Sequence, residues 1–102
     1  MSDAHATPFK VDLGPGVKEQ IEAIKPVAQQ SGQLSQFIQI LEKAYYLLKN
    51  DPHGWGDPAY RSKHVDAVYC HATIRPVAFR YVIYDAVRGV VLLSVRSFAE
   101  FD

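Results

Sequence analysis

The chain has 102 residues, of which 48% are hydrophobic and 22% are charged, so it fits one domain of ordinary soluble composition and leaves no room for a second core. Its 11 basic and 11 acidic residues balance, which argues against a protein that binds nucleic acid through net charge alone. One cysteine excludes an intramolecular disulfide, no apolar stretch reaches the roughly 18 residues of a membrane span, and no signal-peptide pattern precedes the domain, so the sequence predicts a cytoplasmic protein.

The first part of the chain is predicted to enter the domain through a short strand. Residues 1–8 are small and polar, and we interpret them as a disordered tail before a single domain over residues 9–102. Apolar and polar residues alternate over residues 9–13, which is typical of a half-buried strand.

Two helices are predicted next. Apolar residues recur at helical spacing from Val17, and Pro26 should kink or split this first helix. A stronger pattern over residues 34–50 predicts a second helix. Prolines and glycines crowd residues 51–58, which predicts a loop whose Trp55 closes one end of the core.

The last third of the chain is predicted to form three consecutive strands, over residues 67–74, 77–84 and about 90–97. Together with the first strand they give an α+β fold, in which a small antiparallel sheet of about four strands carries the two N-terminal helices on one face. Residues 77–84 form the central strand. The other face of the sheet is then free for a function.

The central strand is apolar at nearly every position except Arg80. Because side chains alternate between the two faces of a strand, the apolar set turns toward the helices and Arg80 toward the open face. The apolar set consists of Val77, Phe79, Tyr81 and Ile83. We expect Phe79 and Tyr81 to share one core with Phe37 and Leu41 of the second helix.

The last strand is placed by pairing Tyr84 with Val90 across the turn. This register sets Ser94 opposite Arg80, with Arg96 diagonal to it on the same face. It also predicts three core residues, namely Val91, Leu93 and Val95.

The strand before the central one is predicted to turn its more apolar side to the core. That side consists of Val68, Cys70, Ala72 and Ile74. Tyr69, His71 and Thr73 then share the open face with Arg80. A slip of one residue would exchange His71 for Cys70, and the sequence leaves that alternative open.

The predicted open face gathers residue types that suit RNA cleavage without a metal. Arg80 and Arg96 are candidates to hold a phosphate bidentately, and His71 is a candidate to transfer a proton near neutral pH. The candidate RNA-binding residues are Tyr69, Ser94 and Lys63. The plainer alternative is a solvated sheet face without a chemical role. No spacing of His, Cys or acidic residues matches a metal site, and the sequence predicts neither metal nor cofactor.

The order of these elements resembles the RelE/ParE superfamily of bacterial toxins, which belong to type II toxin–antitoxin modules of the plasmid-stabilisation type. The resembling segments are residues 9–13, 41–52, 80–85 and 90–95. The resemblance implies an antitoxin partner that holds the toxin inactive. For the ribonuclease branch it implies cleavage of messenger RNA, mostly on the ribosome, by attack of a 2′-hydroxyl without a metal. Arg80 then matches an arginine of the middle strand, and Arg96 a basic residue near the end of the last strand.

Two other functions remain open from the same resemblance. The ParE branch binds DNA gyrase and catalyses nothing. An inactive stand-alone homologue that acts as a binding protein is the second, because Cys70, His71 and Ala72 stand where some members carry lysines. The C-terminal residues 98–102 also lack the tyrosine or histidine that many members use there. An open face shared by His71 and Arg80 would favour the ribonuclease function.

Overall fold

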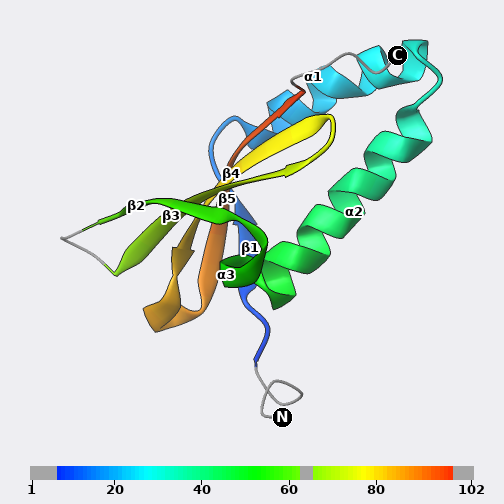
Figure 1. The fold of residues 1–102 in the computed structure, drawn as a ribbon. Coiled ribbons are helices and arrows are strands. Elements are labelled where there is room, and N and C mark those ends of the chain that lie inside the picture. Colours follow the sequence, from blue (N-terminus) through cyan, green and yellow to red (C-terminus); the bar gives the residue numbers. More distant parts are fainter. Residues whose placement is uncertain (1–6, 63–65, 98–102) are drawn as a thin grey trace.

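The computed structural model describes residues 7–62 and 66–97. Figure 1 shows a twisted sheet with helices packed against it. The elements in chain order are β1 (Lys10–Leu13), α1 (Val17–Gln30), α2 (Leu34–Asn50), α3 (Pro52–Trp55), β2 (Asp57–Arg61), β3 (Ala67–Ile74), β4 (Val77–Tyr84) and β5 (Gly89–Ser97). Of the predicted tail, only residues 7 and 8 belong to the described part, and the Thr7 carbonyl accepts hydrogen bonds from the Arg88 guanidinium.

The sheet has the strand order β1-β5-β4-β3-β2, so β4 is central as predicted. All neighbouring strands are antiparallel except β1, which pairs with β5 in parallel. The predicted α+β class is confirmed, with five strands instead of about four. The additional strand is β2, whose first residues were predicted to be loop. All five of its side chains are exposed and it contains Pro58, so it shows no apolar alternation, and its edge position tolerates the proline.

Both N-terminal helices bury one side against the same face of the sheet (Figure 1). Helix α2 has the predicted bounds, and Phe37 lies with Phe79 and Tyr81 in one buried core, against which Leu41 packs. Helix α1 runs through Pro26 without a break, so of the two predicted effects of the proline, a kink or a split, the split is excluded. Apolar residues on both sides of the proline pack on the core, which compensates for the missing amide. No helix in the described ranges is long and apolar enough to cross a bilayer.

Strand β4 separates the two faces of the sheet as the alternation predicts. Its core set of Val77, Phe79, Tyr81 and Ile83 is completely buried, whereas Arg80 is exposed. The core side of β3 is also the predicted one, with Cys70 buried and His71 exposed. The alternative register that would exchange these two residues is therefore excluded.

The predicted register of β5 is wrong at the turn and right beyond it. Tyr84 pairs with Gly89 rather than Val90, because Arg88 in the left-handed region closes a short 3₁₀ turn one residue earlier. As a result Val90 and Leu92 are buried, while Val91 and Leu93 are only half-buried, contrary to prediction. The register then shifts between Arg80 and Tyr81.

This shift is a bulge that leaves Leu93 without a partner of its own. It sets Ser94 opposite Arg80 and returns Val95 to the core, as predicted. Strand β1 has ended at this level of the sheet, and the amide of Val95 instead donates to Oε1 of Gln20 in α1, at 2.7 Å. The helix therefore helps to fix the bulged part of β5.

The hydroxyl of Tyr81 fastens the segment that leads into β2. It donates to the Pro52 carbonyl at 2.6 Å and accepts from the Gly56 amide at 2.9 Å. Its ring stacks on Trp55, with centroids 5.6 Å apart and planes at 10°, so Trp55 closes the core as predicted, although from α3 rather than from a loop. A Cβ at Gly56 would lie 2.5 Å from this hydroxyl and 2.8 Å from the His71 carbonyl oxygen. The close contact of the backbone at position 56 with these two oxygens therefore requires glycine.

Replacing Phe79 with alanine should lower the free energy of unfolding by about 3–5 kcal/mol, because the side chain is fully buried between the sheet and Trp55. Val87→Ala is the control, since Val87 is 76% exposed. Chemical denaturation measures both variants. Equal stability of Phe79→Ala and the control would show that the face assignment is wrong.

The variant Tyr81→Phe should lose about 1–3 kcal/mol, because the Gly56 amide and the Pro52 carbonyl would lose a buried partner. Burial also raises the pKa of Tyr81, so the wild type should lose stability as the pH rises above about 10, where unfolded tyrosine ionises. Denaturation at neutral and alkaline pH tests this, with exposed Tyr46→Phe as control. A pH dependence that Tyr81→Phe leaves unchanged would contradict this account.

Candidate functional site

The open face of the sheet carries a row of polar residues across four strands. His71 on β3 pairs directly with Arg80 on β4, and Arg80 with Ser94 on β5. On the outer side of His71 the register places Asp57 of β2, a residue that the sequence interpretation left in a loop. His71 and Arg80 are exposed, and Ser94 is half-buried. The structure thus brings three of the predicted site residues into direct cross-strand contact positions.

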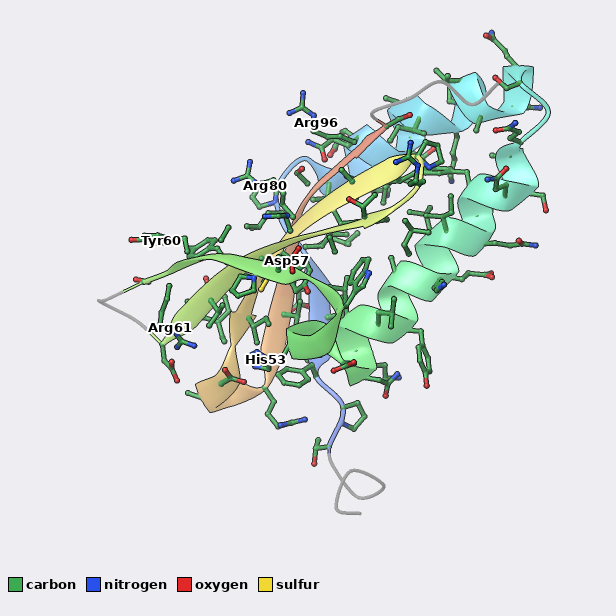
Figure 2. The ribbon with its side chains drawn as sticks, in the orientation of Figure 1. His53, Asp57, Tyr60, Arg61, Arg80 and Arg96 are labelled. Carbon is green, nitrogen blue, oxygen red and sulfur yellow. The ribbon has the colours of Figure 1, made fainter. Side chains whose placement is uncertain are left out.

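Two further predicted residues lie diagonal to Arg80. Arg96 pairs with Ala78, two positions along β4, and Tyr69 pairs with Val82 on the other side. Such diagonal neighbours lie roughly 7 Å apart, within reach of long side chains. Figure 2 shows Arg80 and Arg96 projecting from the side of the sheet that is turned away from α2.

Among the described residues, the guanidiniums of Arg80 and Arg96 lack an acidic partner. Neither Arg80 nor Arg96 has an ion-pair partner within residues 7–62 and 66–97, whereas Arg61 lies 3.5 Å from the Asp66 carboxylate. Two positive charges on one face, neither ion-paired within these residues, attract a group with several anionic oxygens, such as a phosphate, which guanidinium binds in a bidentate manner.

A pocket of about 230 Å³ opens beside Arg80. Its lining consists of Ala59, Tyr60, Tyr69, Cys70, His71, Arg80, Tyr81 and Leu93. The sequence interpretation missed Ala59 and Tyr60, because both belong to β2. The Ala59-Tyr60-Arg61 segment contains one strand-favouring aromatic residue and no alternation, which is too little signal to place a strand.

The buried groups next to this pocket remain neutral. Burial raises the pKa of the Cys70 thiol, and the negative charge of Asp57 adds to this, although a hydrogen bond with Tyr81 acts in the opposite direction. A protonated thiol is a weak nucleophile. Burial likewise raises the pKa of Tyr81. Of the predicted proton-transfer groups, the imidazole of His71 is the exposed one beside this pocket.

Some candidate groups lie outside the cluster. Lys63 falls outside the described residues. His53 lies away from the cluster of His71 and Arg80 (Figure 2). Its Nε2 is 2.8 Å from Oδ1 of Asp85, and this contact links α3 to the turn after β4. Among the residues that the structure describes, no group of three or more His, Cys, Asp or Glu side chains is arranged to hold a metal ion.

Comparisons with known proteins reveal a likeness in structure. No family model and no curated protein matches the sequence. A chain of the toxin–antitoxin complex RelBE2 from Mycobacterium tuberculosis superposes with a TM-score of 0.68 at 20% identity, over 94% of this chain and 95% of that chain. A chain of the archaeal RelE–RelB complex from Pyrococcus horikoshii gives a TM-score of 0.65 at 10% identity, over 89% and 96%. The protein therefore has a RelE-like fold over nearly its whole length.

Proposed function

We propose that this protein is the toxin of a type II toxin–antitoxin pair and acts in the cytoplasm by cleaving messenger RNA without a metal. The observation that carries the proposal is the pairing of His71 with Arg80 on an open face beside a pocket, with Arg96 diagonal to Arg80. An imidazole and two guanidiniums supply the two things that cleavage requires, namely proton transfer and neutralisation of developing charge. The RelE-like fold agrees with this role.

The reaction follows from ordinary phosphodiester chemistry. Neutral His71 accepts the proton of a ribose 2′-hydroxyl, and the 2′ oxygen forms a bond to the phosphorus while the bond to the 5′ oxygen breaks. The 5′ oxygen takes a proton from the imidazolium or from water, which leaves a 2′,3′-cyclic phosphate and a 5′-hydroxyl. Arg80 and Arg96 hold the non-bridging oxygens, on which negative charge accumulates in the transition state.

Loss of the central guanidinium provides the direct test. Arg80→Ala should lower the cleavage rate by about 10²-fold or more, by analogy with the loss of an oxyanion donor, and should leave the fold intact because Arg80 is exposed. Arg80→Lys keeps the charge but loses the bidentate fork, so its rate should fall in between. Lys43→Ala, which removes one exposed charge from α2, is the matched control.

Induced expression of these variants, scored for growth arrest and for cut transcripts in the presence of a chelator, separates the candidate functions. Wild-type protein that neither slows growth nor cuts RNA would contradict the toxin proposal and favour an inactive homologue. Growth arrest with intact transcripts would favour a protein that poisons DNA gyrase by binding. Equal activity of Arg80→Ala and Lys43→Ala would show that Arg80 has no role in cleavage.

The antitoxin is proposed to cover an apolar groove on the opposite side of the molecule. The groove measures about 110 Å³ and lies between the edge strand β1 and the two long helices. Leu13 and Tyr45 border it with 55% and 52% of their surfaces exposed. The Lys49 ammonium lies over the Tyr45 ring, 5.7 Å from its centroid, and favours an acidic partner. Both similar solved structures are complexes of a RelE chain with its partner.

A charge placed in this groove should break the complex. Leu13→Asp would force a carboxylate into the apolar contact, and we expect at least a tenfold loss of affinity for the product of a short reading frame beside the gene. Val87→Asp is the control, because Val87 is equally apolar and 76% exposed but does not line the groove. Size-exclusion chromatography of the co-expressed pair measures the effect. Equal binding by both variants would place the antitoxin elsewhere.

A further inference from the structure

The pocket on the open face has an aromatic side that the proposed acid–base chemistry does not use. Tyr60 of β2 and Tyr69 of β3 line it together with Ala59 and Leu93, and they adjoin His71 and Arg80 on the charged side. One pocket thus combines apolar ring surface with a positive charge. This combination is what the two parts of a nucleotide require, because a base has apolar faces and a phosphate is anionic.

A bulge in β2 brings Tyr60 to this face. Pro58 pairs with Cys70 and Tyr60 pairs with Tyr69, so Ala59 is the extra residue. In a regular ladder Ala59 would pair with Tyr69, and Tyr60 would turn to the other side of the sheet. Bulges frequently redirect a side chain beside a functional site.

The rings of Tyr60 and Tyr69 are tilted against each other and do not stack face to face. Their centroids lie 5.6 Å apart with planes at 52°, so neither ring covers the face of the other. Tyr60 keeps 61% of its surface exposed, whereas Tyr69 is half-buried and held in place by both neighbouring strands. Figure 2 shows Tyr60 at the outer end of the sheet, beyond the strand that bears Arg80. An aromatic side chain so exposed beside a pocket has ring surface available for a ligand.

We propose that Tyr60 and Tyr69 form a subsite for an unpaired nucleobase, next to the phosphate held by Arg80. Tyr69 lies two residues from His71 on β3, about 7 Å along the strand, and diagonal to Arg80. A base on the tyrosines and a phosphate on Arg80 therefore belong to the same nucleotide or to its neighbour. The base must be unpaired, because the faces of bases in a duplex are already stacked. The inference rests on the proposed function, which it extends to single-stranded RNA.

Binding of a non-cleavable strand tests the subsite apart from catalysis. The probe is a short single-stranded RNA with 2′-O-methyl groups, and its partner is the same backbone without bases. Tyr60→Ala should weaken binding of the complete probe by about five- to a hundredfold, the range for loss of one base stack, whereas Tyr60→Phe should bind like the wild type. Tyr46→Ala on α2, where Tyr46 is 63% exposed, should also bind like the wild type.

The salt dependence distinguishes a base contact from a phosphate contact. Fluorescence anisotropy at several salt concentrations gives the slope of the logarithm of the binding constant against the logarithm of the salt concentration. Tyr60→Ala should have the same slope as the wild type, whereas the slope of Arg80→Ala should be smaller by about the amount that one phosphate contact contributes. The baseless strand should bind wild type and Tyr60→Ala equally.

Three results would overturn the inference, and they can be told apart. If the wild type binds the complete probe but Tyr60→Ala binds it equally well, the subsite is wrong while the proposed function stands. If the wild type binds neither strand, both the subsite and the proposed RNA cleavage fail. A Tyr60→Ala variant that binds RNA normally but loses the antitoxin would assign Tyr60 to a protein contact instead.

Discussion

The hydroxyl of Tyr81 holds together the parts on which the candidate site depends. It lies in the core, yet it bonds both the Pro52 carbonyl and the Gly56 amide, and so fixes the short connection between α2 and β2 onto the central strand. Strand β2 has no buried side chain of its own, and this anchor together with its pairing to β3 keeps it in the sheet. Without β2 the pocket would lose Ala59 and Tyr60 from its lining, and His71 would become an edge residue. Core stability and site geometry therefore depend on one buried hydrogen-bonding group.

The central strand serves both layers of the molecule because its side chains alternate. Phe79 and Tyr81 anchor it in the core, and Arg80 between them points out of the opposite face. Because Arg80 stands between two fully buried aromatic residues, its backbone is anchored in the core, which suits the proposed role of its side chain in holding a phosphate. The neighbouring strands then add His71 and Ser94 at the same level through backbone pairing alone.

Much of this arrangement could be predicted from sequence, because strong periodicity carries long-range information. The alternation over β4 placed Arg80 on the open face, and the helical pattern of α2 gave its bounds. Strand β2 could not be predicted, since an exposed edge strand has no apolar pattern and Pro58 argues against one. The bulges in β2 and β5 could not be predicted from the sequence either. Ser94 was correctly placed opposite Arg80 only because two register errors offset each other. The turn ends one residue earlier than predicted, at Gly89, and the bulge then adds one unpaired residue, Leu93. The bulge at Ala59 had no such compensation, so Tyr60 was missed.

The central claim is that the open face of β2–β5 receives RNA. Backbone amide chemical shifts of the full chain, followed during titration with a short 2′-O-methyl RNA, test it most directly. The account predicts shifts that concentrate at Tyr60, His71, Arg80 and Ser94, while Ala44 and Leu48 of α2, on the other side of the sheet, remain unchanged. Shifts confined to the groove between β1 and α2, or no shifts at any RNA concentration, would contradict it.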